Sequence, residues 1–248
     1  MSVPSLLEHV GLDLKGRTIH VDSRQVDPPR QGPAMPAQLS LAAVESLVKR
    51  HPWTPPGLAS FAHGTVQAFD QSLSNTGVAL VKSNESGIHL LATAMIRPPA
   101  DVQALKSTEG NYARADSLYA GLLRARTGMA ANVDGIAYER PPVKGMRVDS
   151  IVLAGREVHR ATHGRAVLVD NRHAKAVIVG RAGTKADPVT KAHVKEAVER
   201  YVTPPAERGL VMPWNEHVRD AVMLALTWLY DEKIRQQQAA ALAVEAAA

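Results

Sequence analysis

The chain has no cysteine and few aromatic residues, and these shortages exclude several kinds of protein. Without cysteine there is no disulfide, no thiolate zinc site and no cysteine nucleophile. With aromatic residues at 4%, a stacking platform for single-stranded nucleic acid is not expected. No apolar run reaches the roughly 18 residues of a membrane span, and the N-terminus lacks the charge order of a signal peptide. We therefore expect a soluble, cytoplasmic protein that has no membrane partner.

What the chain does contain suits one large globular domain with an appendage. It has 248 residues, of which 45% are hydrophobic and 21% charged, and its net charge of +5 fits a polyanionic partner. Residues 1–62 hold eight of the 16 prolines, which predicts a Pro-rich arm with a short helix over 39–49. The core domain is expected over 63–235. The Ala/Gln-rich tail over 236–248 is expected to fray.

The hydrophobic pattern of the core domain predicts a mixed α/β sheet. Strands are expected at 66–70, 78–82, 88–96, 133–139 and 166–169, and helices at 112–126, 149–161, 188–201 and 216–234. Asp187 would cap the third helix, with Pro188 at its first position. Short turns join the first three strands into an antiparallel meander, whereas helices join strands one, four and five as parallel neighbours. A five-stranded sheet with helices on both faces is the outline of the ribonuclease H-like fold.

Three acids occupy positions where an acid gains little structurally. Asp70 ends the first strand, in the stretch VQAFDQSLSNTGVALV, Glu139 ends the fourth, and Asp220 lies near the start of the last helix. Taken singly, Asp70 could cap its turn and Asp220 could be an exposed helix charge. If strands one and four are adjacent, however, their carboxylates meet at the same edge of the sheet. Such a cluster would bind a hard cation such as Mg²⁺.

The last helix offers two further candidates, whose spacing leaves a choice open. His217 precedes Asp220 by three residues and Glu216 precedes it by four, so either could share the face of Asp220. Two metal ions about 3.5–4 Å apart could bind both sides of a phosphodiester, one activating water and the other stabilising the leaving oxygen. Acids from three remote segments could surround such a pair of ions. We therefore expect phosphodiester hydrolysis at this edge.

Over roughly 65–232 the chain resembles the RuvC family of Holliday junction resolvases, as a divergent, phage-like member. AFDQSLSNTGVALV resembles the first motif of the family and GIAYERPP the second, while NEHVRDAVMLALTWLY resembles the last, in which an acid or His precedes an Asp by three. The resemblance implies that Asp70, Glu139, His217 and Asp220 are catalytic residues and metal ligands, with two Mg²⁺ ions per site or Mn²⁺ in their place. It also selects His217 over Glu216.

The same resemblance implies a set of DNA contacts. NRHAKAVIVG resembles the segment that places one family lysine, here Lys175, and Lys191 matches a second. The loop after the catalytic Glu would contribute Arg140, Lys144 and Arg147, and the first turn would contribute Ser72 and Asn75. This loop lacks the aromatic wedge of the family, so Val143 or Met146 would insert instead. For each lysine, a solvated surface charge is the alternative.

The implied function is paired, symmetrical cutting of four-way DNA junctions by a homodimer, to which the helix at 149–161 would contribute, in a bacterial or phage-infected cell. A nuclease of the same fold that cuts other branched DNA or RNA–DNA hybrids is the nearest alternative. A non-catalytic DNA-binding scaffold is another. FDQSLSNTG also resembles the phosphate loop of actin-like sugar kinases. The chain is short for a two-lobed kinase and shows no second Gly-rich loop, so no nucleotide cofactor is expected.

Overall fold

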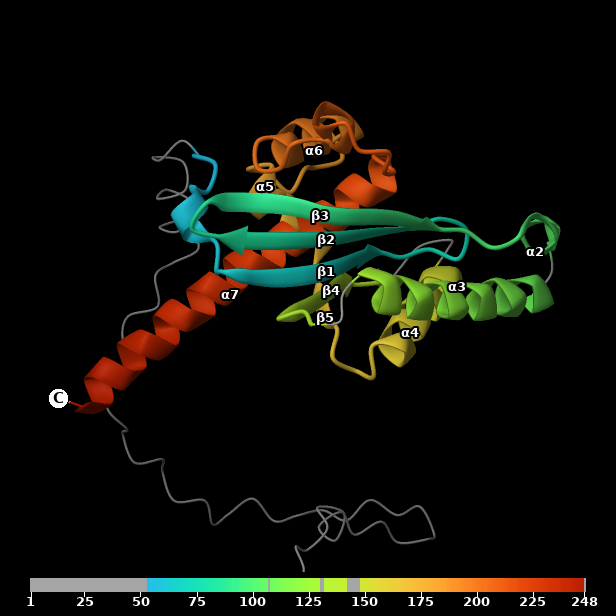
Figure 1. Ribbon diagram of the computed structural model, residues 1–248, viewed down its shortest axis with the longest axis horizontal. Coiled ribbons are helices and arrows are strands. Elements are labelled where there is room, and N and C mark those ends of the chain that lie inside the picture. The colour runs from blue at the N-terminus through green and yellow to red at the C-terminus, as the bar shows by residue number, and fades with distance from the viewer. Residues whose placement is uncertain (1–52, 107, 130–131, 142–147, 248) are drawn as a thin grey trace, which may run out of the picture. The chain divides into compact units, whose positions relative to one another are not determined.

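The computed structural model describes residues 53–106, 108–129, 132–141 and 148–247, all within a compact unit that begins at Trp53 (Figure 1). The predicted arm helix at 39–49 lies outside the described residues. The compact unit starts before the predicted boundary at residue 63, because the segment after Trp53 packs on the core. In this segment the ring of Phe61 is buried and meets Tyr201 and Tyr230 edge-on, with centroids 5.2 and 6.3 Å away.

The predicted mixed five-stranded sheet is confirmed, with the strand order β3-β2-β1-β4-β5. The strands are β1 (Gly64–Asp70), β2 (Thr76–Asn84), β3 (Gly87–Ile96), β4 (Gly135–Glu139) and β5 (Val167–Val169). Strands β1, β2 and β3 pair antiparallel, whereas β4 pairs parallel with both β1 and β5. The parallel pairing brings the carboxyl ends of β1, β4 and β5 to one edge of the sheet.

Helices cover both faces of the sheet, as predicted (Figure 1). Helix α7 (Glu216–Ala247) crosses one face, with α5 (Asn171–Ile178) and α6 (Lys191–Glu199) packed beside it. Helices α3 (Thr108–Met129) and α4 (Val148–Ala161) cover the other face, preceded by the short α2 (Ala100–Ala104). Two 3-10 turns, η1 (Leu58–Ser60) and η2 (Pro205–Arg208), complete the described elements. None of the described helices is both long and apolar enough to cross a membrane.

The alternation of side chains along the central strands divides the core into two layers. In β1, Val66 and Ala68 belong to the cluster under α7, whereas Phe69 belongs to the cluster under α3 and α4. In β4, Ala137 packs toward α7 while Ile136 and Tyr138 pack the other way. Successive side chains of a strand point to opposite faces, so a strand covered on both sides is mainly apolar, although β1 also buries Gln67. This is why Asp70 and Glu139 are conspicuous at the strand ends.

Three predictions about helices were wrong. The helix predicted at 188–201 begins at Lys191, because Thr190 caps it: its hydroxyl accepts a hydrogen bond from the amide of His193, whose ring accepts one from the amide of Thr190. The predicted cap, Asp187, instead pairs with Arg181. Helices α2 and α5 were not predicted. The last helix does not end at residue 234 as predicted, since α7 continues through Ala247, consistent with the helix propensity of Ala and Gln. Fraying of the tail over 236–248 stays a prediction.

Candidate active site

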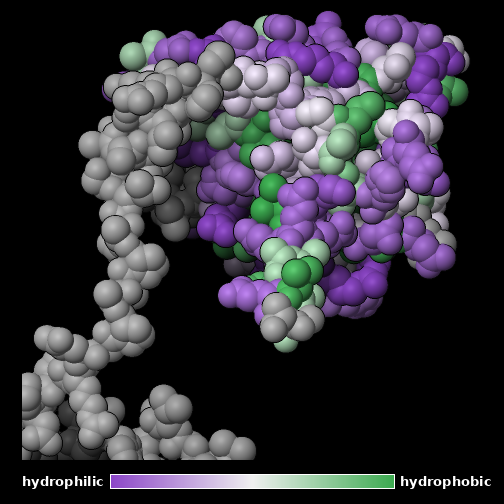
Figure 2. Space-filling model, turned by 90° about the vertical axis from the view of Figure 1, so that its left-hand side faces the viewer, coloured by the Kyte–Doolittle hydropathy of each residue, from purple (hydrophilic) through white to green (hydrophobic). Residues whose placement is uncertain are grey.

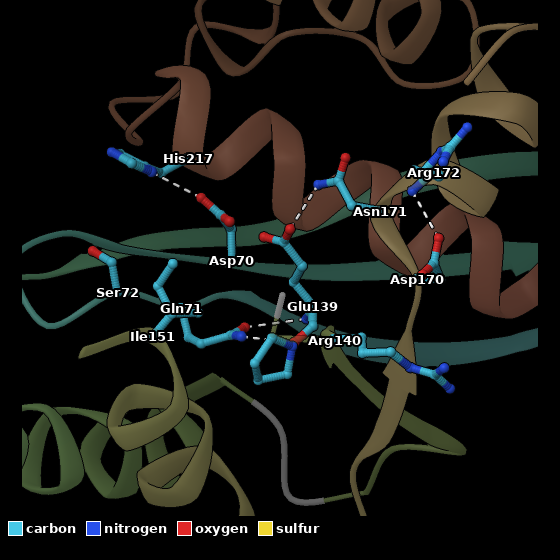
Figure 3. Close-up of a pocket in the computed structure, with 11 residues that line it drawn as sticks. Asp70, Gln71, Ser72, Glu139, Arg140, Ile151, Asp170, Asn171, Arg172 and His217 are labelled. Atoms are coloured by element: carbon cyan, nitrogen blue, oxygen red, sulfur yellow. Dashed lines mark hydrogen bonds and ion pairs between the residues drawn. The ribbon is translucent and has the colours of Figure 1, made fainter. Parts of the chain in front are cut away.

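The four predicted catalytic residues come together at the carboxyl edge of the sheet, where Figure 3 shows Asp70, Glu139 and His217, and Asp220 is close enough for Asp70 to raise its pKa. Asp70 and Glu139 are the last residues of β1 and β4, whose parallel register ends at Phe69 opposite Tyr138. Helix α7 begins over this edge and brings His217 and Asp220 to it. Asp70, Glu139 and His217 line an open cavity of about 670 Å³. The sequence motifs thus converge in one place, although they lie up to 150 positions apart.

The start of α7 is placed by a close approach to β2. Gly77 is paired with Asp70 across β1 and β2, and a Cβ atom on Gly77 would lie 2.2 Å from the carbonyl oxygen of His217. No side chain fits there, so the first turn of α7 rests directly on the backbone of β2. The Asn215 side chain caps this turn by accepting a hydrogen bond from the amide of Val218 at 3.1 Å. These contacts hold His217 above Asp70.

The carboxylates repel one another in a partly buried setting. Burial, followed by the charge of Asp70, raises the pKa of Glu139 to about 7, against the opposing effect of a hydrogen bond from Asn171. Burial and Asp70 likewise raise the pKa of Asp220 to about 6, although Lys175 and Lys191 oppose this shift. The positive charge near these acids is thus too small to offset their burial and mutual repulsion. The site is therefore a strong candidate for binding a cation.

His217 supplies part of the missing charge. Its Nδ1 lies 2.8 Å from Oδ2 of Asp70, and this hydrogen bond is the main reason why the pKa of His217 is raised above 6.5. Glu216, the other candidate from the spacing, pairs with Lys191, and its Oε1 lies 3.8 Å from Nε2 of His217. The imidazole of His217, rather than Glu216, therefore reaches the carboxylates, which is the register that the family resemblance implied.

The donor set suits a hard divalent cation, although the side chains are not arranged around one point. Among the described residues, no group of three or more His, Asp or Glu side chains encloses a position for a metal ion. Asp70 is bonded to His217, and Glu139 is bonded to Asn171. Three carboxylates that repel one another and one imidazole are nevertheless the ligand types that Mg²⁺ and Mn²⁺ accept. By donor chemistry, then, the residues fit such an ion.

Of the predicted DNA contacts, the two lysines lie beside the site. Lys175 is on α5 and Lys191 is the first residue of α6, and both are close enough to Asp220 to oppose the rise of its pKa. Arg140 lines the cavity. Lys144 and Arg147 lie outside the described residues, as do the predicted wedge residues Val143 and Met146.

Ser72 and Asn75 are engaged mainly with each other. The Ser72 hydroxyl donates to the carbonyl of Asn75 at 2.8 Å and accepts from its amide at 2.9 Å. The Asn75 side-chain oxygen accepts from Arg97 at 3.1 Å. These bonds shape the turn after Asp70, and Ser72 also lines the cavity. The polar groups of the two residues thus fix the turn, which the sequence prediction did not anticipate.

Two amide side chains that sequence reasoning missed contact Glu139. Gln71 donates to the Glu139 carbonyl at 2.7 Å and accepts from the Glu139 amide at 3.1 Å. Asn171 donates from Nδ2 to Oε1 of Glu139 at 2.9 Å. The position of Asn171, just after the fifth strand at the carboxyl edge, was an available signal. Gln71 gave no such signal, because its reach across to β4 depends on the pairing of remote strands.

Comparison with known proteins finds relatives by structure only. No protein-family model matches the sequence, and no curated protein matches it either. RuvC of Thermus thermophilus, solved in complex with a Holliday junction substrate, is similar with a TM-score of 0.53 and 17% identity over 69% of this chain and 96% of that one. A second structure of the Thermus thermophilus protein gives a TM-score of 0.50 and 16% identity, covering 68% of this chain and 96% of that chain. The chain therefore has the ribonuclease H-like fold of RuvC.

Proposed function

We propose that this protein is a metal-dependent endonuclease that cleaves four-way DNA junctions. The observation that carries the proposal is that Asp70, Glu139 and His217 line one cavity, with Asp220 close enough to interact electrostatically with Asp70 and Glu139. The shared fold adds support, since the similar RuvC structure holds a Holliday junction substrate. A structural role for this cluster is disfavoured, because buried acids that repel one another destabilise a fold.

The four side chains would hold Mg²⁺ or Mn²⁺, in one or two positions. When bound, the ion would supply positive charge at the scissile phosphate and lower the pKa of an attacking water. Asp70, Glu139 and Asp220 contribute oxygen donors from three separate elements, β1, β4 and α7. His217 would exchange its bond with Asp70 for a role as ligand or proton carrier. The carboxylates thus orient the reacting groups.

Positive side chains around the cavity would bind the DNA backbone. Lys175 and Lys191 lie on the α5 and α6 side of Asp220, and Arg140 and Arg172 line the cavity itself. Lys and Arg near a phosphate neutralise its charge and release condensed counterions, without reading the sequence of the bases. The structure of the junction, rather than a base sequence, would then select the substrate.

Paired symmetrical cuts require two copies of the site. A four-way junction has two scissile strands related by a twofold axis, so we propose a homodimer that supplies one site to each strand. Helix α4 remains the proposed contributor to the dimer contact, and Val152 on this helix is 49% exposed.

The experiment that tests this function compares end-labelled substrates. A four-way junction, a fork, a flap, a plain duplex and an RNA–DNA hybrid of matched sequence are incubated with the protein, with Mg²⁺ or with EDTA and without any nucleotide. We expect Mg²⁺-dependent, symmetrical cuts in the junction and little cutting of the duplex. Equal cutting of flaps and forks would favour a broader branched-DNA nuclease, and cutting of the hybrid alone would favour a ribonuclease. Binding of all substrates without cutting would favour a scaffold.

A further inference from the structure

Asn171, the first residue of α5, directs its side-chain amide at the carboxylate of Glu139 (Figure 3). We propose that Asn171 is the positioning residue that fixes the Glu139 side chain for metal binding. This inference rests on the proposed function, because it assigns Asn171 a role in the same site. Asn171 opens the segment NRHAKAVIVG, in which the sequence analysis gave a role to Lys175 alone.

The backbone holds Asn171 at a defined distance from Glu139. Strand β5 pairs with β4 so that Val169 lies opposite Glu139, and the amide of Arg140 donates to the Val169 carbonyl at 2.8 Å. The chain then turns directly into α5, whose cap is Asp170. The Asp170 carboxylate accepts from the amides of Arg172 at 2.9 Å and His173 at 3.0 Å. The start of α5, and with it Asn171, is therefore anchored to the strand that pairs with β4.

The backbone of Glu139 is fixed independently from the other side. Backbone pairing of β1 with β4 ends at Phe69 and Tyr138. One step farther, the Gln71 side chain, which is only 4% exposed, bonds both the amide and the carbonyl of Glu139. What remains free in Glu139 is rotation about its side-chain bonds. The 2.9 Å bond from Asn171 to Oε1 restricts that rotation and leaves the second oxygen turned toward Asp70 (Figure 3).

The chemistry of the amide suits this task. An Arg or Lys at position 171 would also hold the carboxylate, but its charge would compete with a bound cation. The neutral amide of Asn171 orients Glu139 and leaves its full negative charge for the metal. Partners that orient metal ligands in this way typically change metal affinity by about 10- to 100-fold when they are removed. We therefore expect Asn171 to affect metal binding more than DNA binding.

The test measures divalent-ion binding in the full chain without DNA. Mn²⁺ and Mg²⁺ titrations by calorimetry are compared for the wild type, Asn171→Ala and Asn171→Asp. We expect Asn171→Ala to weaken metal binding by about tenfold. The metal affinity of Asn171→Asp should differ from that of Asn171→Ala, because the introduced carboxylate repels Glu139. Asn84→Ala, which removes a side chain bonded to Ser86 at the far end of β2, is the control and should not change the affinity. Junction affinity in EDTA should stay the same in all variants. Unchanged metal affinity in Asn171→Ala would overturn the proposal.

A double-mutant cycle separates this inference from the proposed function. Unfolding by urea in EDTA is measured for Asn171→Ala, Glu139→Ala and the double variant, a readout that needs neither metal nor DNA. We expect the double variant to depart from the product of the single effects by at least about threefold in the unfolding constant. If the wild type bound no divalent ion, the proposed metal site would fail, while non-additivity would still support the hold of Asn171 on Glu139. Additive effects would show that Asn171 does not fix the Glu139 side chain.

Discussion

Replacing Glu139 by Gln should make the metal-free protein more stable while removing its activity. The pKa of Glu139 is raised from 4.5 to about 7 in the folded chain, chiefly by burial and by Asp70. The folded state thus binds a proton more tightly than the unfolded state. Stability contributed by the protonated acid is complete below about pH 4.5 and is lost as pH rises toward 7. Gln has no charge to lose and can still accept the hydrogen bond from Asn171.

The size of this effect follows from the shift in pKa. A rise from 4.5 to about 7 corresponds to about 3 kcal/mol above pH 7, since each unit is worth about 1.4 kcal/mol. Burial of the amide and the remaining repulsion between Asp70 and Asp220 reduce the gain, so we expect about 1–3 kcal/mol for Glu139→Gln at pH 8 and almost none at pH 4.5.

Urea unfolding in EDTA at the two pH values measures this difference directly. Glu85→Gln, an exposed change in the turn between β2 and β3, is the control and should have little effect at either pH. The reasoning would be refuted if Glu139→Gln were destabilised at pH 8, or if its effect were the same at both pH values. Either result would mean that the carboxylates do not repel one another in the folded chain.

Three further predictions concern the helix start, the metal and the DNA. Gly77→Ala should destabilise the fold by about 1–3 kcal/mol and reduce cleavage, because its Cβ would press on the His217 carbonyl; wild-type stability and activity would contradict this. Metal affinity by calorimetry should rise between pH 5.5 and 8, since Glu139 and Asp220, with pKa values of about 7 and 6, must release protons; a flat profile would count against it. Lys191→Ala should weaken junction binding and lower the log–log salt slope by about one, whereas an unchanged slope would place Lys191 away from DNA.

The sheet could be predicted because its pattern is local. Apolar runs broken by short turns marked the meander, and the strands between helices were expected to be parallel. The missed and misplaced helices have local causes of another kind. The eight residues of α5 are too few for a clear periodic pattern, and α6 begins at a capping box formed by Thr190 and His193 rather than at the Asp-Pro pair before it.

At the site, the sequence indicated the charged residues but not the neutral ones. Asp70 and Glu139 stand out because acids are depleted at strand positions. Gln71 and Asn171 are ordinary residues until β1, β4 and β5 are placed side by side, when their amides meet Glu139. The role of Gly77 is equally hidden, because it depends on how closely α7 approaches β2. Contacts of this kind follow from tertiary packing and leave no local pattern.

The central claim is that Asp70 belongs to a metal site that cuts junction DNA, and a single comparison tests it. Wild type and Asp70→Asn are mixed with a labelled four-way junction, and both binding and Mg²⁺-dependent cleavage are measured. The account predicts that Asp70→Asn binds the junction about as tightly as the wild type, since Lys and Arg contacts provide the affinity, yet produces no cut. Substantial Mg²⁺-dependent cleavage by Asp70→Asn would contradict the account.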